Sequence, residues 1–151
     1  MSNVSRHLEV IYCDDIRNEV GNKFSYMGIY TSELTIPNVP LLLPKLCIAV
    51  KVVADISDPF ESLDVRVVKV QDDEETELLS TGPLPAPPPS GMLGVEKDTA
   101  YILAQMYFML SPFQIDEETI LRVIAKTERE EIRGTALRIR IVPPPASPTI
   151  Q

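Results

Sequence analysis

The sequence predicts an all-β fold, namely a two-sheet antiparallel β-sandwich of immunoglobulin-like or related type with seven to nine strands. Apolar residues recur mainly at every second position in short runs, and β-branched and aromatic residues are frequent in these runs. Turn-forming residues separate the runs at short intervals, which is typical of sandwiches. Amphipathic stretches of helical length are scarce, and a closed barrel is the alternative architecture.

The strands are predicted from this alternation. In the last one Leu137 and Ile139 alternate with Arg138 and Arg140, which indicates an antiparallel sheet with one solvated face. Residues 46–55 carry apolar side chains at both odd and even positions, which point to opposite faces of a sheet. This predicts a central strand that is covered on both faces. The predicted strands are 8–13, 23–30, 46–55, 63–70, 102–110, 120–127 and 135–142, with shorter ones at 34–36 and 77–80.

Charged and glycine-containing segments supply the turns. Residues 71–75 and 128–131 are predicted to be hairpin tips, because each charged run separates two strand-like runs. The alternation slips at Val67-Val68, where a β-bulge is expected. One helical turn is expected within residues 14–20, ended by Gly21-Asn22.

Two proline-rich stretches set the predicted domain organisation. A single domain is expected over residues 1–142, with a proline-rich crossover loop at 82–91, followed by a proline-rich tail at 143–151. Proline has no amide hydrogen and a fixed φ, so neither stretch is expected to join a sheet ladder. The two stretches are interpreted as spacers.

The charge balance bears on partners and location. The 22 acidic and 14 basic residues give a formal charge of −8, which opposes binding to nucleic acid and to anionic membranes. The longest apolar run, 46–54, is interrupted by Lys51 and is too short to span a bilayer. The N-terminus lacks the basic-then-apolar pattern of a secretory signal, so a cytoplasmic location is expected.

The residue types do not favour catalysis. Phosphate-binding glycine loops and the G-x-S-x-G nucleophile motif are absent from the sequence. Cys13 and Cys47 could face each other across paired strands, but two buried thiols are the simpler interpretation in a reducing compartment. With His7 as the single histidine, no ordinary structural zinc site can form. No enzymatic activity, metal or cofactor is therefore expected.

Carboxylates at the end of the first strand provide the candidate binding site. They could offer oxygen ligands to Ca²⁺, but Arg17 would neutralise them, and a salt-bridged turn is the alternative. The candidate residues are Asp14, Asp15, Arg17, Glu19 and Asn22.

A basic face is predicted on the C-terminal strands. Arg122 and Lys126 are both even-numbered positions of one predicted strand, so they point to the same face. A hairpin through 128–131 would bring Arg138 and Arg140 onto the same surface. Such a face either stays solvated or meets an acidic partner, and a second copy of this acidic chain is one candidate.

Three segments carry a resemblance to a known group. They are Cys-Asp-Asp-Ile-Arg-Asn-Glu-Val-Gly-Asn-Lys-Phe-Ser-Tyr-Met-Gly-Ile-Tyr at 13–30, Leu-Pro with Leu46 and Ile48 at 43–48, and Gly134 with Leu137 and Ile139. Together they resemble an uncharacterised group of bacterial all-β domains of unknown function. The resemblance implies a sandwich-like fold and brings no activity. The expected function is therefore unknown in detail: a non-catalytic interaction or structural module, or alternatively a carboxylate-based Ca²⁺ or small-ligand binding domain.

Overall fold

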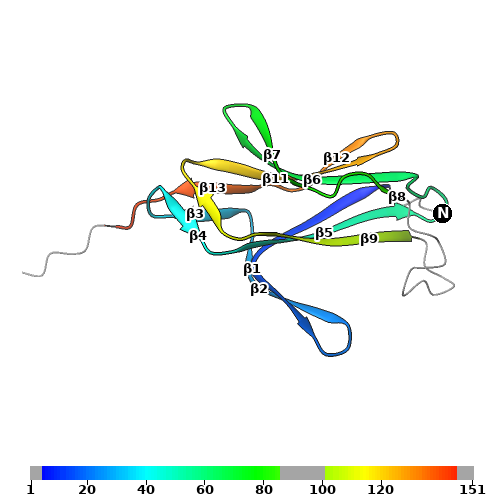
Figure 1. Cartoon of the computed structure of the whole chain (residues 1–151), viewed down its shortest axis with the longest axis horizontal. Coiled ribbons are helices and arrows are strands. Elements are labelled where there is room, and N and C mark those ends of the chain that lie inside the picture. The colour runs from blue at the N-terminus through cyan, green and yellow to red at the C-terminus, as the bar shows by residue number, and fades with distance from the viewer. Residues whose placement is uncertain (1–4, 86–100, 146–151) are drawn as a thin grey trace, which may run out of the picture.

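The computed structural model describes residues 5–85 and 101–145, and all regular secondary structure in these ranges is β (Figure 1). The prediction of an all-β fold is confirmed. In the described ranges no helix exists that could cross a membrane.

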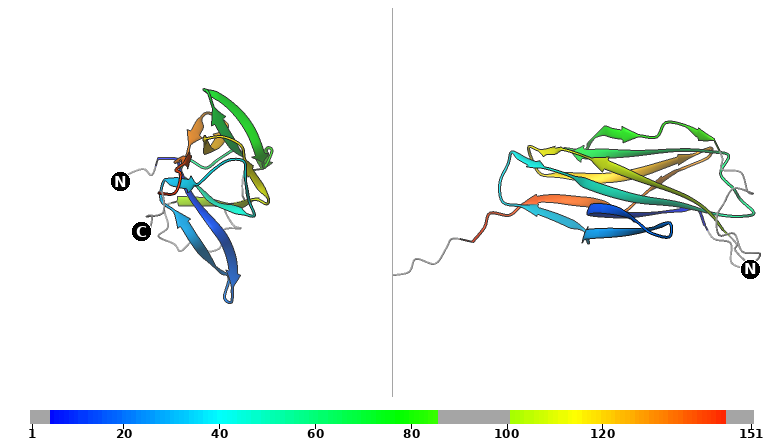
Figure 2. Two further views of the ribbon diagram at one scale, coloured as in Figure 1. Left: turned by 90° about the vertical axis from the view of Figure 1, so that its left-hand side faces the viewer. Right: turned by 60° about the horizontal axis from the view of Figure 1, so that its bottom comes forward.

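Four strands form the first sheet, called sheet A here. All its neighbouring pairs are antiparallel, in the order β2-β1-β5-β9. Its strands are β1 (His7–Glu19), β2 (Lys23–Tyr30), β5 (Leu46–Asp55) and β9 (Tyr101–Leu110). The β1–β2 hairpin continues beyond the sheet and projects from the body of the molecule (Figures 1 and 2).

The second sheet, called sheet B here, has the main order β3-β13-β11-β6-β7, with β12 pairing β11 and β8 pairing β6. Its strands are β3 (Glu33–Ile36), β6 (Ser62–Gln71), β7 (Glu74–Ser80), β8 (Leu84–Pro85), β11 (Thr119–Thr127), β12 (Glu131–Arg133) and β13 (Leu137–Ile141). The pair β13–β3 is parallel, so the prediction of purely antiparallel sheets was wrong at this edge. A small separate sheet pairs β4 (Leu41–Leu43) with β10 (Phe113–Ile115).

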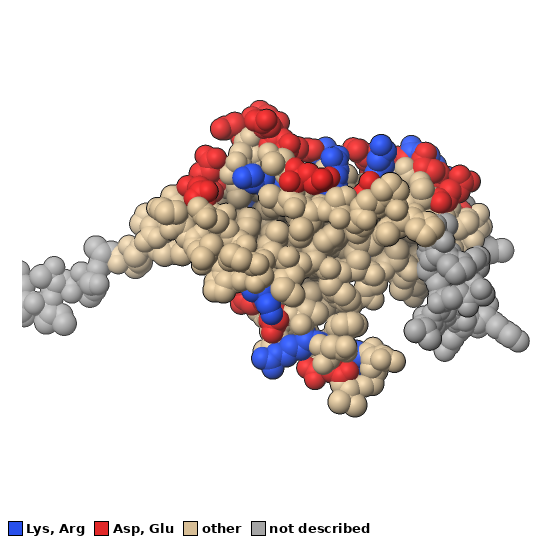
Figure 3. All heavy atoms as spheres, in the orientation of Figure 1, with Lys and Arg blue, Asp and Glu red and all other residues tan. Residues whose placement is uncertain are grey.

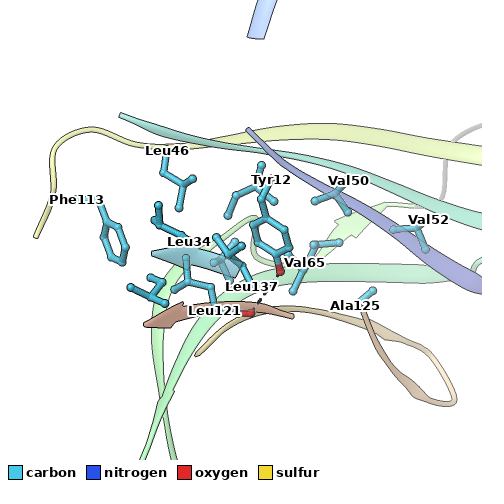
Figure 4. Packing of buried hydrophobic residues seen from close by; sticks show 14 of the residues in the cluster. Tyr12, Leu34, Leu46, Val50, Val52, Val65, Phe113, Leu121, Ala125 and Leu137 are labelled. Atoms are coloured by element: carbon cyan, nitrogen blue, oxygen red, sulfur yellow. Dashed lines mark hydrogen bonds between the residues drawn. The ribbon is translucent and has the colours of Figure 1, made fainter. Parts of the chain in front are cut away.

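Both large sheets contribute side chains to one hydrophobic core (Figure 4). Sheet A supplies alternate residues of β5, including Val50 and Val52, and sheet B supplies residues such as Val65, Leu121 and Leu137. Val50, Val52, Val65 and Leu121 have no solvent exposure. Burial of apolar surface is therefore the main force that holds the sheets together.

Tyr12 joins the two sheets through a polar contact inside this core. Its hydroxyl donates to the carbonyl of Thr135 at 2.8 Å and lies 3.4 Å from the carbonyl of Leu121. Burial raises the pKa of Tyr12 well above its usual value, so the hydroxyl keeps its proton and remains a donor.

We expect Tyr12→Phe to lower the free energy of unfolding by about 1 to 2 kcal/mol, because the carbonyl of Thr135 loses its hydrogen-bond donor. Urea denaturation followed by circular dichroism measures this loss. Unchanged stability would show that the hydroxyl contributes nothing net to the contact between the sheets.

Several predicted strands are found at their expected positions. The predicted strands 23–30 and 46–55 coincide with β2 and β5. The bulge at Val67-Val68 is present as a register shift against β7. The charged tip at 71–75 is confirmed as the β6–β7 turn, where Asp72 and Asp73 have φ of 49° and 62°. The tip at 128–131 is confirmed as the β11–β12 turn.

Other predictions need correction. Residues 14–19 continue strand β1 and do not form a helical turn, because β2 supplies a ladder partner along this stretch. The thirteen strands of the described ranges exceed the predicted seven to nine, since β4, β8, β10 and β12 are too short to show periodicity.

The proline-rich loop joins a ladder at its start. Leu84 and Pro85 pair with Leu63 and Ser62 of β6, although no ladder pairing was expected for this stretch. These residues lie outside the main strand order of sheet B, where a missing amide donor is tolerated. Residues 86–91 of the predicted loop and 146–151 of the predicted tail lie outside the described residues.

Candidate interaction surface

Asp14 and Asp15 make separate contacts. Asp14 accepts a hydrogen bond from the Tyr30 hydroxyl on the neighbouring strand. Asp15 binds Lys45 Nζ at 2.7 Å and has Arg17 Nε at 3.5 Å. The hydrogen bond from Lys45 holds the pKa of Asp15 below its usual range. The two carboxylates are therefore engaged by different partners.

The rest of the predicted turn lies away from these contacts. Glu19 ends β1, and Asn22, with φ of 55°, belongs to the turn that leads into β2. In the part of the chain that the structure describes, no group of three or more His, Cys, Asp or Glu side chains is arranged to hold a metal ion. The structure does not gather the five predicted residues into one site.

Glycines of the segments that carry the resemblance have packing roles. Gly28 has φ of 68°, and a Cβ built there would lie 2.8 Å from Cγ of Asp14. A Cβ at Gly134 would lie 2.6 Å from Cγ2 of Val10 and 3.0 Å from Leu8. A side chain at either position would collide with side chains of β1. These two glycines are therefore needed for the packing of the fold.

Cys13 and Cys47 are directly opposite in the β1–β5 register, and both are buried and free. The interpretation as buried thiols is confirmed. Burial, with a smaller contribution from Cys47, raises the pKa of Cys13 to about 11, and burial also raises the pKa of Cys47. Thiols in this state are weak nucleophiles at neutral pH.

The predicted basic residues lie on sheet B. Arg138 and Arg140 are exposed on β13, and Ile120 of β11 is the register partner of Arg138. Arg140 lies 3.3 Å from Glu33, and Arg122 donates to the carbonyl of Gly134 at 3.0 Å. Nearby glutamates also pair with arginines in Arg66–Glu131 and Arg133–Glu75. The surface that carries Arg122, Lys126, Arg138 and Arg140 thus contains paired charges of both signs.

Sheet A turns away from the core a face that contains two uncharged rows. The residues of β5 that alternate with its core residues point to this outer face, and register pairing extends them into rows across the strands. One row runs Ile29–Cys13–Cys47–Met109, and the next runs Ile11–Ala49–Tyr107. Glu9, Lys51 and Gln105 form the polar row that follows.

Exposed hydrophobic side chains concentrate on sheet A. Ten large ones are exposed among the described residues, and seven of these lie on β2, on β9 or in the β1–β2 turn. These seven are called the apolar surface: Val20, Phe24, Met27, Ile29, Tyr101, Leu103 and Met109. Ile29 and Met109, each 55% exposed, occupy the two ends of one row over the buried thiols. Such a concentration on a small domain is typical of an interaction site.

Aromatic residues join the projecting hairpin to the far strand of sheet A. The rings of Phe24 and Tyr107 lie 4.7 Å apart, and those of Tyr26 and Tyr107 lie 6.4 Å apart. Gln105 Nε2 donates to the Tyr107 hydroxyl at 2.7 Å. Because β1 and β5 separate β2 from β9 in the sheet, these contacts show that the hairpin reaches across the outer face.

An open depression of about 330 Å³ lies at the other end of this face. Its lining combines the polar groups of Glu9 and Lys51 with apolar side chains. The remaining lining residues are His7, Val53, Tyr101 and Leu103. The depression adjoins the apolar surface through Tyr101 and Leu103, and within its lining His7 Nε2 lies 3.4 Å from Glu9 Oε1.

The model of a family of unknown function, DUF6941, matches residues 9–140. The chain belongs to the DUF6941 family. A search of curated proteins gives no match. The match spans all three segments that carry the resemblance, which confirms that the chain belongs to an uncharacterised domain group.

The apolar surface of this DUF6941 chain was not predicted from the sequence. A signal was present, because residues 101–110 run for ten positions without a charged residue. Lys45 was not predicted as the partner of Asp15 either, and no local pattern indicates it because thirty residues separate the two.

Proposed function

We propose that the chain is a non-catalytic protein-interaction module that binds a protein partner through the apolar surface. The observation that carries this proposal is the placement of seven of the ten exposed large hydrophobic side chains of the described ranges on sheet A or in its β1–β2 turn. Strand β9 has no charged residue, and the two rows that run from Cys47 and Ala49 across the outer face of sheet A are uncharged, so this part of the face can exclude water against a partner at a low desolvation cost.

The chemistry of the described residues supports a non-catalytic role. The two thiols stay protonated, and Asp14 and Asp15 are occupied by Tyr30 and Lys45. The carboxylate of Asp58 pairs with Arg129 and Arg6. Nucleophilic and metal-assisted reactions both need groups that are free to act.

We further infer that sheets A and B form a β-sandwich, in which the outer face of sheet A remains available. Support comes from their shared core and from the bond between Tyr12 and the carbonyl of Thr135. A partner in the cytoplasm agrees with the two free thiols, since disulfides are rare in that compartment.

The test compares partner capture by the wild-type chain and by the double variant Met27→Ser/Ile29→Ser. Both residues lie on β2 and are 43% and 55% exposed. We expect proteins retained from the native host's extract by the wild type to be lost with the variant, because polar side chains interrupt the apolar contact.

A matched control is Leu42→Ser/Ile56→Ser, whose residues are 59% and 45% exposed outside the apolar surface. This control should retain the same proteins as the wild type. Equal capture by all three chains, each with wild-type circular dichroism, would rule out the apolar surface as the binding site.

A further inference from the structure

Strand β9 is an open edge of sheet A. Within the described ranges its ladder partner is β5, and its other side has no strand neighbour. The β5–β9 register is continuous over ten residue pairs, from Tyr101 to Leu110. The strand contains no charge, proline or glycine. A long, regular, apolar edge of this kind readily accepts another strand.

The edge strand β7 of sheet B has the opposite character. It carries Glu74, Glu75 and Glu77 in seven residues, and the register of its ladder shifts at Val67-Val68 of β6. Charges and bulges are devices that prevent pairing between edges. Sheet B has both devices here, and β9 has neither.

The inner side of β9 is incompletely covered. Met106 and Phe108 pack against the core but remain half-buried, whereas their register partners on β5, Val50 and Ile48, are fully buried. The core therefore thins towards the β9 edge. An additional strand along this edge would cover apolar side chains on both sides of the sheet as well as open backbone groups.

We propose that β9 pairs antiparallel with β9 of a second copy of this chain, across a two-fold axis at Gln105. The two copies of sheet A then form one continuous sheet. This register places Tyr101 opposite Met109 and Leu103 opposite Tyr107 on the outer face. On the inner face, Ile102 lies opposite Phe108 and Ala104 opposite Met106. Gln105 lies opposite Gln105 of the second copy, so the two side-chain amides face each other. Every other pair consists of apolar or aromatic side chains.

Charge distribution favours a second copy as the occupant. A net charge of −8 opposes contact between two copies over most orientations. The charged side chains gather over sheet B and on the hairpin, however, and the surface along β9 between them is largely uncharged (Figure 3). Two chains can therefore approach edge to edge along β9 with little repulsion. The two-fold arrangement also covers both open edges at once.

This dimer goes beyond the proposed function and does not depend on it. The pairing uses the backbone edge of β9, and it leaves Met27 and Ile29 of β2 at the outer ends of the joined sheet. Loss of partner capture through β2 and loss of the dimer through β9 are thus separate results.

The test measures the mass in solution of the full chain and of two variants, Gln105→Lys and Gln105→Glu, by light scattering after size exclusion. We expect the wild type at twice the 16.8 kDa chain mass. Each variant alone is expected at the single-chain mass, because like charges face each other across the axis. An equimolar mixture of the two should return to twice the chain mass, since the introduced ammonium of one copy then faces the introduced carboxylate of the other.

Gln114→Lys is the matched control, because it places the same charge on an exposed residue of β10, and it should stay dimeric. A monomeric wild type overturns the proposal. Dimers formed by Gln105→Lys or Gln105→Glu alone also overturn it, as does a mixture of the folded variants that stays monomeric. Circular dichroism of each variant verifies folding, and Gln105→Ser, which adds no charge, should keep the dimer if the proposal is right.

Discussion

Gly28→Ala is expected to destabilise the domain by about 2 to 3 kcal/mol, because backbone strain and the loss of a hydrogen bond add together. Gly28 has φ of 68°, a conformation that costs an alanine about 1 to 2 kcal/mol. The new Cβ would also lie 2.8 Å from Cγ of Asp14, so the carboxylate must move. That movement would break the hydrogen bond from Tyr30, which is exposed to solvent and is worth about 1 kcal/mol. Urea denaturation gives the total effect.

Gly21→Ala separates the two causes. Gly21 also has a positive φ, 89°, but a Cβ there meets no atom within 4 Å. Its substitution should therefore show the backbone cost alone and a smaller loss of stability. If both variants lose the same free energy, the contact between Gly28 and Asp14 has no energetic importance.

The fold was predictable where side-chain alternation is long and bounded by turns. Strand β5 shows both: its core residues alternate over ten positions, and Pro44 lies just before it. Strand β1 was predicted to end six residues too early, because its extension past Cys13 is stabilised by pairing with β2 and not by a local pattern. The parallel pair β3–β13 joins residues about a hundred positions apart, so local periodicity carries no information about it.

For the candidate site, only the kind of contact, an ion pair with a carboxylate, was predictable from the sequence. Arg17 was correctly expected to have a carboxylate nearby, and Asp15 lies 3.5 Å from it. The sequence could not identify Lys45 as the partner of Asp15, because the two residues come together only when the turn before β5 is folded. The apolar surface depends on which strands become edges and which faces stay uncovered, and both are properties of the assembled sheets.

Arg6 forms the most buried ionic contact in the described residues, and no local sequence pattern indicates it. Its side chain is 2% exposed, with Nη2 at 2.5 Å from Glu128 and 3.4 Å from Asp58. Its guanidinium carbon lies 5.2 Å from the ring centre of Phe60. Arg6 lies directly before β1 of sheet A, and Glu128 lies in the β11–β12 turn of sheet B. Their contact therefore links the two sheets at one end.

Arg6→Met is expected to lower the free energy of unfolding at neutral pH by about 3 kcal/mol, because Glu128 loses its buried counter-charge. The value lies at the low end for buried pairs. Glu128 is 21% exposed and can regain some water, and Nε and Nη1 of Arg6 are already buried without a partner among the described residues. The double variant Arg6→Met/Glu128→Gln should recover part of the loss, which a double-mutant cycle measures.

Acid titration of the same variants tests the electrostatic origin of this loss. Burial alone would raise the pKa of Glu128, but the hydrogen bond from Arg6, together with backbone hydrogen bonds, lowers it from 4.5 to about 2. Because the folded-state pKa is depressed, the stabilisation is complete above pH 4.5 and is lost as the pH falls towards about 2. The stability difference between wild type and Arg6→Met should therefore shrink across this interval in chemical denaturation at successive pH values. A difference that stays constant from neutral pH to pH 2 would mean that Arg6 acts through packing on Phe60 and not through its charge.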